Sequence, residues 1–279
     1  MPALEEKRQA LIACLKDLGG VAVAFSGGVD STLLLKIAHD TLGEKAVALT
    51  ARSASFPLRE LNEAKAFCEG EHIRHILFDS GEMDDDRYTS NPVNRCYLCK
   101  SGFLAKAVEI AHAHGIPHVA EGSNVDDMGD YRPGLTAVAE LGVKSPLRQA
   151  GLTKADIRAL SRELGLKTWN KPSFACLSSR IPYGEKITPQ RLAMIDKAEQ
   201  FLLDMGIVQV RVRAHGNLAR IETDGAGMAR IMEEANRKAI HAAFRGYGFA
   251  YVSLDLMGYR TGSMNEPLKA APPAKAPEP

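Results

Sequence analysis

Ser26-Gly27-Gly28-Val29-Asp30-Ser31 is the most informative segment of this chain. An apolar run at residues 21–25 precedes it, and a helix-like stretch at residues 32–38 follows it. A strand, a glycine turn and a helix N-terminus in this order bind phosphate through backbone N–H groups and the helix dipole. The two glycines let the backbone turn tightly and approach an anion. A Walker A loop is excluded because no Gly-Lys-Ser/Thr follows, and a serine-rich turn without a ligand is the alternative.

This loop resembles the SGGxDS loop of the N-type ATP pyrophosphatases, the PP-loop superfamily. The resemblance implies that Ser26, Gly27, Gly28, Asp30 and Ser31 bind the phosphates of ATP. Enzymes of this superfamily transfer AMP to an oxygen of the substrate and release pyrophosphate.

The first part of the chain alternates strand-like and helix-like segments. Strands are expected at residues 21–25, 46–50, 74–78 and 117–121, with helices at residues 6–18, 31–42, 58–68 and 102–114. This alternation predicts an α/β fold with a parallel sheet covered by helices on both faces. Ligands of such sheets bind beyond the carboxyl ends of the strands.

A smaller α+β domain is expected to follow. Residues 189–206 have the pattern of an amphipathic helix, and residues 207–213 alternate as in a half-buried strand, with Arg211 and Arg213 on the polar side. Further strands are expected at residues 218–222 and 250–256, around a helix at residues 231–244. We therefore predict a PP-loop domain at residues 1–184 and a substrate or oligomerisation domain at residues 185–266. A disordered tail rich in Pro, Ala, Lys and Glu is expected at residues 267–279.

Composition narrows the class of protein. The chain has 279 residues, of which 45% are hydrophobic and 25% charged, as in ordinary globular proteins. Its net charge of +1 gives no general attraction to nucleic acid. No apolar run approaches the roughly 20 residues that span a bilayer, and the N-terminus lacks the apolar core of a secretion signal. We expect a cytoplasmic protein without a membrane or nucleic-acid partner.

Polar residues follow other predicted strands. Asp126, together with Asp30, is a candidate to hold Mg²⁺ against phosphate oxygens. The PP-loop resemblance places a Gly-x-Asn-like segment here, which adds Gly122 and Asn124 to the nucleotide site. Thr50 begins a segment at which that superfamily cradles adenine and ribose. Plain polar turns are the alternative at both places.

The cysteines Cys96, Cys99 and Cys176 leave several interpretations open. A redox pair needs a thioredoxin-like setting, and structural zinc needs four ligands. Three thiolates suit a [4Fe–4S] cluster with one open iron, and a lone reactive Cys176 is a further alternative. Cys14 and Cys68 fall in helical stretches and are expected to be buried.

The segment around Cys176 strengthens the resemblance. Asn170-Lys171-Pro172-Ser173-Phe174-Ala175-Cys176-Leu177-Ser178-Ser179-Arg180 reads as an interdomain loop, in which Lys171 and Arg180 would favour a thiolate. With the phosphate loop and the ending Asp255-Leu256-Met257-Gly258-Tyr259-Arg260-Thr261-Gly262-Ser263-Met264-Asn265, it resembles the LarE family. Members are ATP-dependent sulfur transferases that help to build the nickel-pincer cofactor of lactate racemase.

The resemblance implies a definite reaction. The substrate would be pyridinium-3,5-dicarboxylate mononucleotide, one carboxylate of which is adenylated by ATP and then converted to a thiocarboxylate. In one version Cys176 gives up its own sulfur and becomes dehydroalanine. In the other, Cys96, Cys99 and Cys176 hold a [4Fe–4S] cluster that carries an extra sulfide, which an unidentified donor reloads. The paired cysteines favour the cluster version.

The resemblance also assigns substrate contacts. Arg211 and Arg213 would bind the phosphate of the substrate, as paired guanidiniums suit anions, although a solvated strand face is the alternative. From their place just after Cys176, Ser179 and Arg180 are candidates to position or neutralise the substrate. Glu199, on the helix expected at residues 189–206, is a candidate to face the same site, and a surface charge is the alternative there. Family members form homo-oligomers.

Three other functions remain open at this point. A tRNA thiolase would combine the ATP loop with cysteines but should show an RNA-binding module or a basic stripe. An ammonia-transferring synthetase for GMP or NAD would give no reason for three cysteines. A non-enzymatic nucleotide-binding module would release no pyrophosphate.

Overall fold

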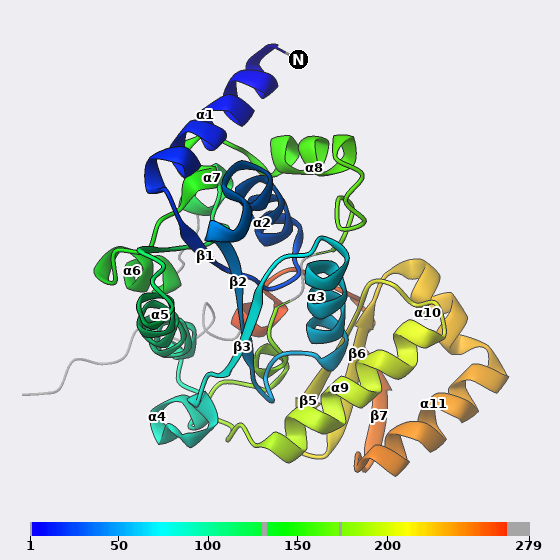
Figure 1. Cartoon of the computed structure of the whole chain (residues 1–279). Helices are drawn as coiled ribbons and strands as arrows, with labels where there is room; N and C mark the ends of the chain where they lie inside the picture. The colour runs from blue at the N-terminus through cyan, green and yellow to red at the C-terminus, as the bar shows by residue number, and fades with distance from the viewer. Residues whose placement is uncertain (1, 130–132, 173–174, 267–279) are drawn as a thin grey trace, which may run out of the picture. The chain divides into compact units, whose positions relative to one another are not determined.

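The alternating strands and helices expected in the first part of the chain are present in the computed structural model, which describes residues 2–129, 133–172 and 175–266 (Figure 1). Four parallel strands lie in the order β3-β2-β1-β4. Their bounds are Val21–Ala24 for β1, Ala46–Arg52 for β2, His75–Asp79 for β3 and His118–Ala120 for β4. Val21 pairs with Ala46 on one side and His118 on the other. The predicted α/β parallel sheet is confirmed.

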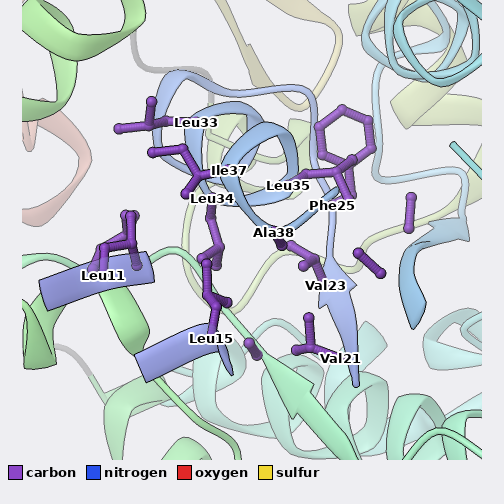
Figure 2. Packing of buried hydrophobic residues seen from close by; sticks show 14 of the residues in the cluster. Leu11, Leu15, Val21, Val23, Phe25, Leu33, Leu34, Leu35, Ile37 and Ala38 are labelled. Carbon is purple, nitrogen blue, oxygen red and sulfur yellow. The ribbon is translucent and has the colours of Figure 1, made fainter. Parts of the chain in front are cut away.

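Helices cover both faces of this sheet (Figure 1). They are α1 (Pro2–Leu18), α2 (Val29–Leu42), α3 (Leu58–Gly70), α4 (Asp86–Thr89), α5 (Arg95–Ala113), α6 (Pro133–Glu140), α7 (Pro146–Gln149) and α8 (Lys154–Glu163). Side chains of β1 alternate between two cores: Val21 and Val23 pack with α1 and α2, whereas Ala22 packs with α5. Figure 2 shows the first core, in which leucines of α1 and α2 meet the valines of β1. The sheet is therefore buried on both faces, as parallel sheets are.

Two parts of this region differ from the sequence prediction. Helix α5 begins at Arg95 rather than at residue 102, so that the C-x-x-C pair lies inside a helix. Helix α6 is absent from the helices expected for this region.

The chain divides into two compact units, Met1–Ala175 and Cys176–Pro279. The division falls ahead of the boundary expected at Gly184. The reason is that η4 (Leu177–Arg180) packs on α9 (Pro189–Asp204) and β5 (Val210–His215), which belong to the second unit. The predicted tail at residues 267–279 lies outside the described residues.

The second unit is an α+β structure built on a three-stranded sheet. Strand β6 (Leu218–Thr223) lies between β5, to which it is antiparallel, and β7 (Tyr251–Leu254), to which it is parallel. Helices α10 (Gly225–Met232) and α11 (Glu234–Tyr247) replace the single helix expected at residues 231–244. The half-buried pattern predicted for β5 is wrong, because every residue from Val210 to Ala214 is buried. In neither unit do the described helices include one long and apolar enough to cross a membrane.

Candidate functional site

The phosphate loop (residues 26–31) joins β1 to α2, as the sequence predicts. Gly28 occupies the N-cap of α2, and a glycine has no side chain to cover the N–H groups of the first turn. The hydroxyl of Ser31 donates to the Gly28 carbonyl at 3.2 Å and lies 3.1 Å from the hydroxyl of Ser26. Gly27 has a φ of 68°, the left-handed region that favours glycine. The loop thus presents an anion-binding helix N-terminus.

The loop after β4 packs directly on the phosphate loop. A Cβ atom on Gly122 would lie 3.1 Å from the Ser31 nitrogen and 3.2 Å from the Asp30 Cβ, so a side chain there would push on the backbone of the phosphate loop. The Asn124 amide donates to the Asp30 carboxylate at 3.4 Å. The structure therefore brings Gly122 and Asn124 together with Asp30, as predicted.

Two further side chains define the surroundings of Asp30. The ammonium of Lys154, at the start of α8, contacts the Asp30 carboxylate. Asp126, a predicted magnesium ligand, accepts the backbone N–H of Lys154 in the first turn of α8 at 2.7 Å. The carboxylate of Asp30, in the first turn of α2, has the oxygen donors that suit Mg²⁺. Sequence reasoning missed Lys154, although the Thr153 capping box before it marks the start of a helix.

Buried polar groups support the carboxyl edge of the sheet. Thr50 is buried, and its hydroxyl donates to the Phe25 carbonyl at 2.7 Å, so it accepts from His75 Nε2 at 2.8 Å. The Thr50 hydroxyl thus joins β2 to β3 and to the residue after β1. This is the edge of the sheet at which the sequence predicts that adenine and ribose bind. Glu82, also missed from the sequence, accepts the hydroxyl of Ser55 at 2.9 Å and that of Ser53.

Glu121, directly after β4, is the centre of another buried network. Its carboxylate accepts hydroxyls of Ser123 and Ser145, each at 2.7 Å, and the Lys100 ammonium at 3.0 Å. Burial raises the pKa of Glu121, but Lys100 and the two hydroxyls outweigh burial and hold that pKa below its ordinary value. An ionised Glu121 thus links α5 to the edge of the sheet beside the phosphate loop.

The three predicted cluster ligands fall in different units. Cys96 is exposed and Cys99 half-buried, one turn apart near the N-terminus of α5 in the first unit. Cys176 is half-buried at the N-cap of η4 in the second unit. Three thiolates have the donor chemistry of a [4Fe–4S] cluster. Over the described ranges, however, no group of three His, Cys, Asp or Glu residues is placed to hold a metal ion.

The other two cysteines and Lys171 are placed within the first unit. Cys68 is buried as predicted, and burial raises the pKa of its thiol to about 12. Cys14 is half-buried instead, with its sulfur 3.1 Å from the Gln149 side-chain oxygen. The ammonium of Lys171, expected to favour a thiolate at Cys176, contacts carboxylates of α3.

The arginine–glutamate cluster of the second unit comprises Arg180, Glu199, Arg211, Arg213 and Glu222. Arg180 and Glu199 form a buried bidentate pair with two contacts of 2.9 Å. Burial raises the pKa of Glu199, but Arg180 outweighs it and holds the pKa below the ordinary value. This pair is therefore charged despite its burial.

Arg180 also fixes the turn that follows Cys176. Its guanidinium donates to the Cys176 carbonyl at 3.1 Å and to the Ser179 hydroxyl at 2.9 Å. Glu199 accepts the Val212 backbone N–H at 2.9 Å, which ties the pair to β5. The predicted residues Cys176, Ser179, Arg180 and Glu199 thus lie together.

Arg211 and Arg213 are both buried, which excludes the solvated strand face. Arg213 donates to Glu222 at 2.7 Å and 3.0 Å and to the Ser179 carbonyl at 3.1 Å. The Arg211 guanidinium lies 5.3 Å from the centre of the Tyr259 ring. Burial, with the charge of Arg180, lowers the pKa of Arg211 to about 10. An anion beside Arg211 would therefore be stabilising.

The comparisons with known proteins agree with this geometry. A pyridinium-3,5-bisthiocarboxylic acid mononucleotide synthase of Lactiplantibacillus plantarum is 39% identical over 274 residues, which cover 97% of this chain and 98% of the relative. An uncharacterized protein of Synechocystis is 43% identical over 265 residues, covering 95% and 99%. A glutamine-hydrolyzing GMP synthase chain of Thermoplasma acidophilum is 23% identical over 266 residues, covering 89% and 82%. No family model matches the chain.

The near-complete coverage and the phosphate loop on β1 and α2 together decide the assignment. The synthase relative matches both units over their length. The distant GMP synthases agree with the parallel sheet and its glycine loop. The chain belongs to the LarE family of the ATP-using PP-loop superfamily, and it is an enzyme.

Proposed function

We propose that this enzyme adenylates a carboxylate of pyridinium-3,5-dicarboxylate mononucleotide and converts it to a thiocarboxylate. The observation that carries the proposal is the phosphate loop, in which Gly28 opens the N-terminus of α2 beside the Asp30 carboxylate. The activity for which the Lactiplantibacillus plantarum relative is named supplies the substrate class, since that relative matches nearly the whole chain.

In the first step, residues 26–31 hold the phosphates of ATP by backbone N–H groups and serine hydroxyls. Asp30 would hold Mg²⁺, which, when bound, would neutralise the charge of the phosphates. A substrate carboxylate oxygen attacks the α-phosphorus, the bond to the bridging oxygen breaks, and pyrophosphate leaves with that electron pair. The product is an acyl adenylate, which makes AMP a good leaving group for the second step.

The arginine–glutamate cluster supplies the substrate contacts. Arg211 binds the phosphate or the second carboxylate of the mononucleotide, since burial among other guanidiniums makes an anion favourable there. Arg213 is held by Glu222 and fixes the Ser179 carbonyl, so it positions the turn after Cys176. Arg180 orients the Ser179 hydroxyl.

For the sulfur source, we propose that Cys96, Cys99 and Cys176 together hold a [4Fe–4S] cluster. Such a cluster, when bound, supplies an open iron that carries the transferable sulfide. The support is the donor set: two thiols one helical turn apart on α5, and the thiol of Cys176, whose backbone carbonyl accepts from Arg180. The alternative is sacrificial donation, in which the Cys176 sulfur attacks the acyl carbon, AMP leaves, and the Cβ–S bond breaks with loss of the α-proton.

Two measurements test these steps separately. Pyrophosphate release that depends on the pyridinium mononucleotide supports the activity, whereas release that depends on tRNA contradicts it. Iron and acid-labile sulfide are then measured after anaerobic reconstitution of the wild type and of Cys96→Ala. About four of each per chain, lost in the variant, support the cluster. No iron, with a fall in protein mass by that of H₂S after turnover, supports sacrificial donation.

A further inference from the structure

Lys171, which the reaction described above does not use, makes three contacts in the first unit. Its ammonium donates to the Gly27 carbonyl at 3.1 Å and to the carboxylates of Glu60 and Glu63, each at 2.6 Å. An ammonium has three donors, so these contacts use all of them. The Lys171 side chain is 11% exposed and that of Glu60 is 3% exposed, so this contact is far more than a surface ion pair.

The segment that carries Lys171 is fixed independently of the lysine side chain. Arg158 of α8 donates to the carbonyls of Trp169 at 2.9 Å and Lys171 at 3.1 Å. The guanidinium of Arg162, also on α8, lies 5.2 Å from the centre of the Trp169 ring. The backbone of Lys171 is therefore anchored on a helix, and its side chain reaches from that anchor to the phosphate loop.

The contact with Gly27 determines how the phosphate loop presents its donors. Gly27 adopts a positive φ, and the peptide that follows it carries the N–H of Gly28. In a trans peptide the C=O and the next N–H point in opposite directions. A hydrogen bond that holds the Gly27 carbonyl on the Lys171 side therefore directs the Gly28 N–H away from it, toward the Ser26 hydroxyl of the same loop, which accepts it at a long 3.4 Å. Loops bind phosphate by such oriented N–H groups.

We propose that Lys171 is a positioning residue that holds the Gly27–Gly28 peptide in the orientation required for ATP phosphates. The inference rests on the proposed function only in taking ATP as the ligand of the loop. Glu60 and Glu63 hold the ammonium, and Arg59, 3.2 Å from the other oxygen of Glu60, completes the support. Lys171→Met should raise the Kd for MgATP about tenfold to a hundredfold, as expected for loss of a charged hydrogen-bond donor.

A purely structural role would make Lys171 no more than the counter-ion of the buried Glu60. The double variant Glu60→Gln/Lys171→Met separates the two roles, because it removes the unpaired carboxylate and the donor to Gly27 together. If Lys171 positions the loop, the double variant regains the melting temperature of the wild type while its Kd for MgATP stays raised. If Lys171 only neutralises Glu60, the melting temperature and the Kd for MgATP of the double variant both return to the wild-type values.

The experiment measures the Kd for MgATP by calorimetry, and the melting temperature, in the full chain. The four proteins are the wild type, Lys171→Met, the double variant and Lys167→Met, an exposed lysine of the same segment, as the control. A raised Kd for MgATP in both Lys171 variants, with an unchanged Kd in Lys167→Met, supports the inference. A wild-type Kd in either Lys171 variant overturns it. Pyrophosphate release by the wild type is measured separately, so failure of the proposed reaction leaves the Kd comparison valid.

Discussion

The ammonium of Lys100 lies 3.0 Å from the buried carboxylate of Glu121. Lys100 directly follows Cys99 on α5, and Glu121 directly follows β4 beside the phosphate loop. The ion pair therefore joins the helix that carries the C-x-x-C pair to the edge of the sheet at which ATP is expected to bind.

Lys100→Met should lower the free energy of unfolding by about 1–3 kcal/mol, because it leaves Glu121 buried without its cation. Urea denaturation measures the change, and Lys106→Met, an exposed position on the same helix, is the control. The pKa of Glu121 lies below 4.5 in the wild type, so its contribution is present above pH 4.5 and lost as the pH falls through the folded-state value. The difference in unfolding free energy between the wild type and Lys100→Met should therefore shrink in acid. A difference that stayed constant would contradict an ionised Glu121 as its cause.

Asp30→Ala should lower pyrophosphate release at least about a hundredfold, comparable with the loss of one strong electrostatic contact to a transition state. The fold should persist, because the Asp30 side chain is 25% exposed and its cation Lys154 is 38% exposed. Circular dichroism checks the fold, and a coupled assay measures pyrophosphate. If Asp30→Ala released pyrophosphate at the wild-type rate, Asp30 would not be a ligand of the metal ion.

Arg211→Ala should weaken binding of the pyridinium mononucleotide about tenfold to a hundredfold and leave that of MgATP nearly unchanged. The reason is that Arg211 belongs to the arginine–glutamate cluster, where we propose that the mononucleotide binds, whereas the proposed ATP contacts come from residues 26–31. Calorimetry with each ligand separates the two effects. Equal losses for both ligands would place Arg211 outside the substrate site.

Stability should fall as the pH drops below about 6.5, the ordinary pKa of histidine. Burial and the nearby charge of Lys65 lower the pKa of His75, and burial also lowers that of His215. Below pH 6.5 these histidines therefore bind more protons in the unfolded chain than in the folded chain. The free energy of unfolding falls as the pH decreases from the unfolded-state pKa to the folded-state pKa. His75→Gln, which cannot titrate, should show a shallower fall in melting temperature between pH 7 and pH 5. Identical slopes would exclude His75 as a source.

The parallel sheet was predictable because its signals are local. Each strand is a short apolar run followed by a turn, and Gly27 and Gly28 mark the transition to α2. The start of α5 was missed, although Asn94 at its N-cap is a residue type that favours this position. The Asn94 side chain makes no capping hydrogen bond, and α5 is held by tertiary contacts such as that of Lys100 with Glu121. Tertiary contacts of this kind contribute more to the stability of a helix in a protein than its intrinsic helix propensity does.

Some residues of the candidate site could be predicted from the sequence and others could not. Asp30 and Gly122 follow directly from the phosphate-loop pattern. Lys154 and Glu121 could not be chosen from the sequence, because their roles arise from pairing with residues far along the chain. The burial of Arg211 and Arg213 was missed because alternation along β5 indicates only which residues share a face. It does not show that a second layer covers that face.

The buried Cys68 gives the first unit an internal reporter. A thiolate is the reactive form of cysteine, and a thiol with a pKa of about 12 inside the core offers almost none to a reagent. Exposed Cys96 should be alkylated at once, whereas Cys68 should be alkylated only when α3 detaches from the sheet. The rate of that slow labelling, followed by mass spectrometry, would measure how often the core opens under native conditions and how far bound nucleotide suppresses the opening.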